Sequence, residues 1–431
     1  MSMKTDKGKK KQDKKRKFLI FAAVLLCLIC IVVIGMSIRE IIEKSAETSS
    51  VGSRPKTTKD SGHTQEKRPE KKENEEIQQP KKSVSEAERI LLEMTVEEKA
   101  AQLFIITPET LTQEEVLTQA GDVLQNAFAS YPVGGFIMMQ GNIVSPEQIT
   151  ELNHTIEGMS INAVGLKPFL AVDEEGGTVA RIAGNETFPV ENRGNMSDVG
   201  STGDPMKAYE TGAYIGGYLA EYGFNLDFAP DADIWLNPEN TVVRYRSFGS
   251  DVQLVSDMTA AAVRGFHSAG ICTALKHFPG HGGTAEDSHE GFAYAARSPE
   301  ELRECEFLPF QAGIEAGSEF VMIGHITVPE ITGEGTPATL SGNMVTDILR
   351  KELGYEGIIV TDAMNMGAIS ANYSSDTAAA EAVKAGVDMI LMPADFYGAY
   401  EGILSAVASG EISEERLDES VKRIIELKLK L

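Results

Sequence analysis

The stretch Lys276–Glu290, KHFPGHGGTAEDSHE, concentrates groups that could carry out acid–base chemistry. Three of the seven histidines of the chain fall inside it, and Asp287 precedes the last of them, His289, by two positions. In an extended loop these two side chains can point the same way, so that the carboxylate orients the imidazole and raises its proton affinity. A histidine held in this way can protonate a leaving oxygen and later take a proton from water.

A metal site and a structural polar loop are the alternatives for this stretch. His277, His281, Asp287 and His289 provide enough ligands for zinc. However, a metal ion would repel the neighbouring cation of Lys276, and no HxH pair lies on an early strand. A phosphate-binding loop is less favoured, because no GK[ST] sequence accompanies the glycines. We therefore favour acid–base chemistry without a metal or organic cofactor.

The elements that must position these groups are short apolar runs separated by amphipathic, helix-like segments. Runs of this kind are typical of strands buried on both faces of a parallel sheet. Their alternation with helical segments predicts an α/β fold, the (β/α)8 barrel. A doubly wound open sheet is the competing fold, but no GxGxxG follows the first run. The eight runs are 103–106, 134–139, 169–172, 225–230, 271–276, 320–325, 357–362 and 388–392.

Helix signals support this interpretation. Thr95 with Glu98, and Ser298 with Glu301, have the spacing of a capping box at a helix start. Gly317 is expected to end the segment that begins at Ser298, and a closing helix is expected over 413–431. We expect the barrel to occupy residues 85–431, with no second domain after it.

Polar residues follow several of the predicted strands. Active sites of barrel enzymes lie at the carboxyl ends of the strands, so we expect these side chains to gather at one rim. Any one of them alone could instead serve as a helix cap or a structural ion pair. The residues concerned are Asp173, Asp227, Asp231, Asp233, Lys276, His277, His325 and Asp362.

The amino-terminal segment predicts a membrane anchor. Residues 1–17 hold eight lysines and one arginine against two aspartates, and residues 18–38 are uncharged. Twenty-one uncharged residues can cross a bilayer of about 30 Å, and the positive-inside rule places the basic tail in the cytoplasm. A cleaved signal peptide is less favoured because a small-x-small site is missing. Residues 39–84 are polar and charged, which predicts a flexible linker to an extracellular catalytic domain.

Composition excludes some classes of function. The chain carries a formal net charge of −24 despite its basic tail, so the body is acidic and nucleic acid is not an expected partner. Of four cysteines, Cys27 and Cys30 lie in the uncharged run. The other two, Cys272 and Cys305, are expected to be buried thiols, since two cysteines make no disulfide framework.

With these motifs in place, the chain resembles the bacterial β-N-acetylglucosaminidases of glycoside hydrolase family 3 over about residues 90–431. The matching stretches are KHFPGHGGTAEDSH, VDEEGGTVAR, LDFAPDADI, RSFG, VMIGHI and IIVTDAMNM. The family fold is a (β/α)8 barrel. One departure is DEEGG, where the family often has Gln as the second residue. The chain has two arginines at the RSFG motif, and the assignment to Arg246 instead of Arg244 depends on the RSF match alone.

The resemblance implies a role for each matching position. Asp362 would be the nucleophile, His289 the acid/base and Asp287 its partner in a dyad. In many relatives a second domain supplies the proton, and here the DSH histidine would take its place. The positions implied to bind the sugar are Asp173, Arg181, Arg246, Lys276 and His277.

The implied reaction is double displacement with retention through a glycosyl–aspartate ester. An exported, membrane-tethered enzyme of this kind meets peptidoglycan, so we expect it to release terminal N-acetylglucosamine from muropeptides or cell-wall disaccharides, acting as a monomer. The alternatives are a β-glucosidase or xylosidase of the same family, a metal-dependent hydrolase on the same barrel, and a catalytically silent wall-binding protein. Whether water or phosphate is the acceptor is left open by the residues.

Overall fold

The computed structural model describes residues 84–284 and 293–431. The predicted tail, membrane span and linker of residues 1–84 lie almost wholly outside the described residues, as do Asp287 and His289. Among the described helices, none is long and apolar enough to cross a membrane.

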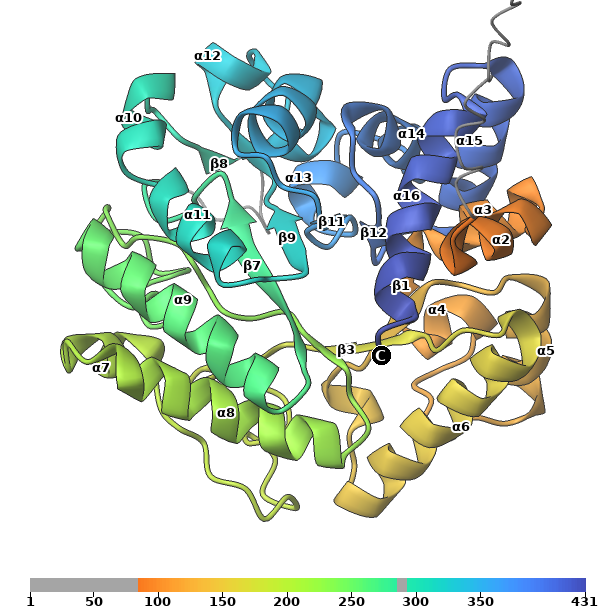
Figure 1. Ribbon diagram of the computed structural model, residues 1–431, viewed down its shortest axis with the longest axis horizontal. Coiled ribbons are helices and arrows are strands. Elements are labelled where there is room, and N and C mark those ends of the chain that lie inside the picture. The colour runs from red at the N-terminus through yellow and green to blue at the C-terminus, as the bar shows by residue number, and fades with distance from the viewer. Residues whose placement is uncertain (1–83, 285–292) are drawn as a thin grey trace, which may run out of the picture. The chain divides into compact units, whose positions relative to one another are not determined.

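A parallel sheet of eight strands forms the centre of the described chain. Each of the eight predicted runs overlaps one of its strands, so that prediction is confirmed, although β7 extends two residues past its run. Figure 1 shows the helices arranged around these strands in the order of the chain. The strands are β1 (Phe104–Ile106), β2 (Gly135–Ile137), β3 (Phe169–Val172), β6 (Leu226–Asp227), β7 (Cys272–Phe278), β9 (Phe320–Ile323), β11 (Ile358–Thr361) and β12 (Ile390–Leu391).

The strand order β11-β9-β7-β6-β3-β2-β1-β12 brings the sheet close to a closed barrel. Its two edge strands, β11 and β12, are joined by an isolated parallel bridge between Val360 and Met389. The Thr361 N–H also donates to the Met389 carbonyl at 3.0 Å. The fold is therefore barrel-like with a nearly closed parallel sheet, in agreement with the predicted class.

Several strands are shorter than the apolar runs that predicted them. The run 225–230 forms only the two-residue β6, because Pro230 has no N–H to donate to a ladder. Hydrogen bonds to β7 nevertheless continue past it, since Ala274 N–H donates to Ala229 O at 2.9 Å and Ala232 N–H to Lys276 O at 2.7 Å. This extension keeps residues 229–232 beside the carboxyl half of β7.

Helices connect the strands and cover the outside of the sheet. The capping boxes at Thr95 and Ser298 are confirmed. The segment after Ser298 was expected to be one helix, but it breaks at Cys305. The helices are α2 (Glu86–Glu93), α3 (Val96–Gln102), α4 (Pro108–Thr112), α5 (Asp122–Ser130), η1 (Gln140–Asn142), α6 (Pro146–Val164), α7 (Met196–Ser201), α8 (Pro205–Glu221), α9 (Val252–Ser268), α10 (Pro299–Glu304), α11 (Phe307–Glu315), α12 (Pro329–Thr332), η2 (Ala338–Leu340), η3 (Asn343–Glu352), α13 (Gly367–Ser370), α14 (Ser375–Ala385), α15 (Phe396–Ser409) and α16 (Glu414–Lys428).

Two small strand pairs were not predicted. The antiparallel pair of β4 (Glu174–Gly176) and β5 (Val179–Ala180) follows β3 directly. The parallel pair of β8 (Ala293–Tyr294) and β10 (Ile326–Thr327) follows β7 and β9. Because both pairs come after the carboxyl ends of barrel strands, they belong to the rim where the polar residues were expected.

Candidate active site

A cluster of opposite charges lies at the carboxyl ends of β3 and β7. Lys276 Nζ is 3.0 Å from Asp173 Oδ1 and 2.6 Å from Glu175 Oε1. Arg246 binds the same Glu175 with two parallel hydrogen bonds of 2.8 Å each. Two-point guanidinium–carboxylate pairs fix the direction of both groups. Glu175 therefore holds the two predicted sugar-binding cations together.

The alternation of side chains explains which acids of the DEEGG motif join this cluster. Asp173 and Glu175 are two positions apart and share one side of the extended chain. Glu174 points the other way, where it accepts hydrogen bonds from the backbone N–H groups of residues 181–183 and from Tyr218 Oη. Burial raises the pKa of Glu174 despite these hydrogen bonds. Glu174 is therefore a support for the hairpin that precedes Arg181.

Arg181 lies next to the cluster, with its Nη2 3.8 Å from Asp173 Oδ2. Its Nε is buried and has no hydrogen-bond partner among the described residues. Arg244 and Arg246 point to different places, although they are two positions apart. Arg246 enters the cluster, whereas Arg244 is exposed over the ring of Trp235. The expected placement of Arg246 in the site is thus supported by geometry that the sequence did not provide.

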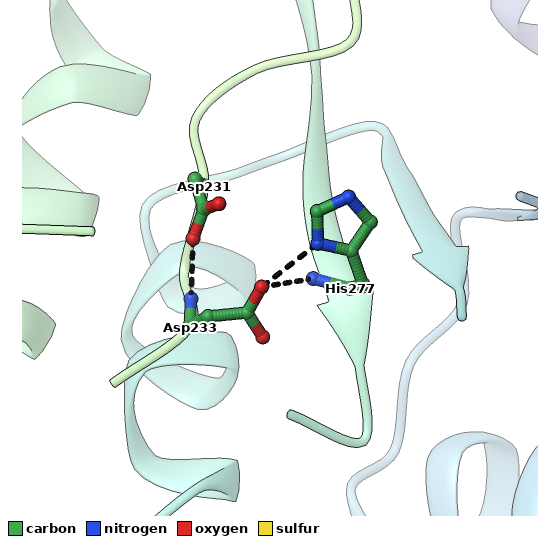
Figure 2. A group of neighbouring side chains, drawn as sticks. All are labelled: Asp231, Asp233 and His277. Carbon is green, nitrogen blue, oxygen red and sulfur yellow. Dashed lines mark hydrogen bonds and ion pairs between the residues drawn. The ribbon is translucent and has the colours of Figure 1, made fainter. Parts of the chain in front are cut away.

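His277 is held in place by Asp233, as Figure 2 shows. Asp233 Oδ2 lies 2.8 Å from His277 Nδ1 and accepts from the His277 N–H at 3.3 Å. The other ring nitrogen of His277 is 3.2 Å from Arg246 Nη2. Because a guanidinium only donates, the contact with Arg246 is a hydrogen bond in the tautomer of His277 that carries its proton on Nδ1, toward Asp233. Asp231 in turn accepts from the Asp233 N–H at 2.9 Å.

One group of side chains has a spacing that is compatible with a metal ion. One possible ligand atom from each of Asp231, Asp233 and His277 lies within 4.8 Å of the others. Asp233 and His277 already bind each other, and Asp231 Oδ1 accepts from the Asp233 N–H. Asp231 Oδ2 is buried without a hydrogen-bond partner among the described residues, and Arg246 Nε lies 3.6 Å from it. The cations of Arg246 and Lys276 would oppose a further positive charge here. The contacts therefore favour a hydrogen-bonded network that orients His277.

His281, a ligand in the zinc alternative, is buried and donates its backbone N–H to Asp233 at 2.6 Å.

Asp362 follows β11 at the same rim. Its N–H donates to Ile323 O at 2.8 Å, and its Oδ1 accepts from the Ala363 N–H at 2.8 Å. Burial alone would raise the pKa of Asp362, but the influence of His277 and His325 and the hydrogen bond from Ala363 lower it below the ordinary value. Asp362 is therefore ionised at neutral pH, as a nucleophile must be.

The two ends of the segment that holds Asp287 and His289 are anchored near these residues. At one end, Thr284 Oγ1 lies 3.0 Å from His281 Nδ1, and Asn240 Nδ2 donates to Thr284 O at 3.1 Å. At the other end, Ala293 pairs with Ile326, three residues past the end of β9. The residues between these anchors are outside the described part of the chain, so the positions of the dyad remain a prediction.

Sequence reasoning missed Glu175 and gave no function to Asp233. The missed signal for both is the same two-residue spacing: Asp173 with Glu175, and Asp231 with Asp233, follow neighbouring strands β3 and β6. The motifs alone do not show which acid of each pair contacts a cation. That pairing depends on how the loops after the strands fold.

Comparison with known proteins shows which family the chain resembles. Residues 95–427 match the glycosyl hydrolase family 3 N-terminal domain. The chain is 35% identical over 333 residues to a β-hexosaminidase A of Pseudoalteromonas piscicida, covering 72% of this chain and 55% of that protein. It is also 35% identical over 286 residues to a β-hexosaminidase of Stenotrophomonas maltophilia, covering 64% of this chain and 80% of that one.

Among solved structures, a family 3 β-N-acetylglucosaminidase from Paenibacillus sp. superposes with a TM-score of 0.73 at 37% identity. The match covers 78% of this chain and 62% of the Paenibacillus chain. The chain thus spans only about half to two thirds of the length of two of these relatives. The family match extends over nearly all of the barrel and includes every described candidate residue, and the chain therefore belongs to glycoside hydrolase family 3.

Proposed function

We propose that this protein is a retaining exo-β-N-acetylglucosaminidase. The observation that carries the proposal is the juxtaposition of an ionised Asp362 with the cluster of Asp173, Lys276 and Arg246 at one rim. Glycoside cleavage passes through an oxocarbenium-like state, which requires a carboxylate on one face of the sugar ring and hydrogen bonds to its hydroxyls. The names of the relatives, β-hexosaminidase and β-N-acetylglucosaminidase, support an N-acetylated amino sugar as the glycone.

In the proposed first step, Asp362 attacks the anomeric carbon and the glycosidic oxygen leaves. The new bond is an ester between the sugar and Asp362, and water then hydrolyses it with net retention. The pKa of Asp362 is lowered despite burial, so the carboxylate is ready to attack without losing a proton first.

We assign the proton transfers to His289, oriented by Asp287, on the basis of the family resemblance. The anchors of their segment, Thr284 and Ala293, are tied to residues of the same rim. Nine Cα–Cα steps separate the anchors in the sequence, so the segment between them can span at most about 30 Å. The imidazolium would protonate the leaving oxygen, and the neutral ring would then activate water.

Sugar binding is proposed for Asp173, Arg181, Arg246, Lys276 and His277. Charge-assisted hydrogen bonds from such groups position a ring more firmly than neutral ones do. Lys276 and Asp173 have their partners already in place, so little reorganisation is needed when the sugar enters.

We further propose that the natural substrates are peptidoglycan fragments with terminal N-acetylglucosamine, outside the cell. Support comes from residues 18–38, which are uncharged and follow a basic tail, the pattern of a single-pass anchor. The proposal includes a cytoplasmic amino terminus, a linker over residues 39–84 and a catalytic domain over 85–431.

Hydrolysis of p-nitrophenyl sugars by the full-length protein tests the proposed activity. We expect the N-acetylglucosaminide to be cleaved and the glucoside and xyloside to be poor substrates, with no change after treatment with a chelator. Preference for the glucoside would instead identify a β-glucosidase. Loss of activity with chelator and its recovery with zinc would favour a metal-dependent hydrolase that uses Asp231, Asp233 and His277. Faster turnover in phosphate than in other buffers would point to phosphorolysis.

A further inference from the structure

His325 is a buried histidine at the rim that has no role in the reaction as described so far. It follows β9, whose two neighbours in the sheet are β7 and β11 (Figure 1). One neighbour ends at His277 and Phe278, and the other is followed directly by Asp362. The side chain of His325 has no accessible surface, so what it does must be visible in its contacts within the protein.

One contact of the His325 ring fixes the turn that carries Asp362. His325 Nε2 lies 3.1 Å from Ala363 O. Because a carbonyl oxygen only accepts, Nε2 carries a proton and donates this hydrogen bond. The N–H of the same Ala363 holds Asp362 Oδ1 at 2.8 Å, and the Asp362 N–H donates to Ile323 O at 2.8 Å. A contact that holds Ala363 in place therefore also holds the carboxylate of Asp362.

The other ring nitrogen contacts a hydroxyl group that can either donate or accept. His325 Nδ1 lies 2.8 Å from Thr339 Oγ1, and the same Oγ1 lies 3.1 Å from Gly324 O. When the ring is neutral, Thr339 donates to Nδ1. When the ring is an imidazolium, Nδ1–H donates to Thr339, whose hydroxyl then donates to Gly324 O. Both forms of the ring keep these hydrogen bonds, so the ring can hold a positive charge although it is buried.

A positive charge on this ring acts on the carboxylate of Asp362. Burial would raise the pKa of Asp362, but positive charge on His277 and His325 lowers it, and Lys276 acts in the same direction. Lys276 and His277 belong to β7, His325 follows β9, and the segment η2 contributes the uncharged Thr339. Cations on two strands thus favour the ionised form of Asp362, which is the form that attacks.

We propose that His325 is a positioning residue for the nucleophile. Its ring fixes the turn at Ala363 and, as an imidazolium held by Thr339, keeps the Asp362 carboxylate charged and in one orientation. This inference rests on the proposed function in one respect, the attack of Asp362 on a glycoside. It does not depend on which sugar the glycoside carries.

The test measures the pH profiles of kcat and kcat/KM on p-nitrophenyl glycosides, whose leaving group needs no proton. His325→Gln keeps a donor for Ala363 O but cannot carry a charge. It should lower kcat about 10-fold, because the carboxylate is held less firmly. The acid limb of kcat/KM should move upward by about one pH unit, since an opposite charge nearby lowers the pKa of an aspartate by about 1–3 units.

Two further variants separate the charge of the ring from its contacts. Thr339→Val keeps the shape of the side chain and removes the hydroxyl group that the imidazolium needs. It should move the acid limb in the same direction as His325→Gln, with a smaller loss of kcat because the contact with Ala363 remains. His267→Gln is the matched control, since His267 on α9 binds Glu319 at 3.0 Å and precedes β7 at the opposite end of the strand. It should change neither kcat nor the acid limb.

An unmoved acid limb in His325→Gln would overturn the inference, whether kcat is unchanged or falls only in proportion to the folded fraction in urea unfolding, because a merely structural histidine gives that result. If the unmodified protein prefers a glucoside or a xyloside, the proposed sugar is wrong, and the same profiles on that substrate still decide the role of His325. A protein that cleaves none of these glycosides would refute the proposed function and this role together.

Discussion

Glu175→Gln is the substitution that tests the charge cluster most directly. Glu175 is buried, and both Lys276 and Arg246 contact its carboxylate, at 2.6 and 2.8 Å. Burial by itself would raise the pKa of Glu175, but Arg246 and Lys276 hold it well below the usual range. Glu175 is therefore charged throughout the neutral range, and the glutamine removes a full negative charge while keeping the shape.

The size of the effect follows from what each cation can still contact. The amide oxygen of glutamine can accept from one cation, but its NH2 group then faces the other. Removing one partner of a buried ion pair costs about 3–5 kcal/mol of stability. Lys276 keeps Asp173 at 3.0 Å and Arg246 keeps Asp231 at 3.6 Å, so we expect the lower end of that range.

Activity should change along with stability, because both cations would move toward their remaining partners and away from the sugar. We expect KM for p-nitrophenyl N-acetylglucosaminide to rise about 10–100-fold, with a smaller change in kcat, since the lost contacts hold the sugar in the ground state and the transition state alike. Urea unfolding measures the loss of stability separately.

Glu175→Asp is the matched variant, because it keeps the charge and shortens the side chain by one methylene. It should recover most of the stability but only part of the affinity, since the two-point contact with Arg246 depends on reach. A folded Glu175→Gln variant with the KM of the unmodified protein would show that Glu175 does not position the sugar-binding cations.

Three further predictions concern the reaction and the pH dependence of folding. Asp362→Asn should abolish turnover while the protein stays folded, and residual activity above about 1% would exclude it as the nucleophile. His289→Ala should lower kcat about 10²–10⁴-fold on alkyl glycosides and less on activated aryl glycosides; an equal loss on both would remove it from the acid role. Lys428 on α16 is buried, donates to Gln102 Oε1 at 2.7 Å and lies over the ring of Phe169, and burial lowers its pKa to about 7. The unfolded state therefore binds more protons from about pH 7 to 10, so stability should rise with pH by about 1 kcal/mol per unit there. Lys428→Met should lack that rise, and parallel curves for the two proteins in urea unfolding would contradict the argument.

The strands could be predicted from the sequence because a strand that is buried on both faces is a short run of apolar residues. Runs such as 169–172 and 320–323 are apolar throughout, and polar residues appear where each strand ends. The direction of the chain alone then assigns those polar residues to one rim. The family resemblance reached further, since the DSH and VTDAMNM motifs name candidate residues for the reaction.

The lengths of the strands and the partners of the charges could not be predicted in the same way. A two-residue strand such as β6 depends on where Pro230 interrupts the ladder and on how far β7 extends beside it. The pairing of Glu175 with Arg246 joins residues 71 positions apart, and the pairing of Lys276 with Asp173 joins residues 103 apart.

By itself the sequence determined which residues lie at the rim of an α/β barrel, because their placement depends on local periodicity and on the order of the elements. Only the tertiary structure decided that Glu175 holds two cations, that Glu174 faces away, and that Arg246 enters the site while Arg244 stays outside. These choices depend on the folding of loops between distant strands, where electrostatic pairing and burial act over contacts that no local pattern records.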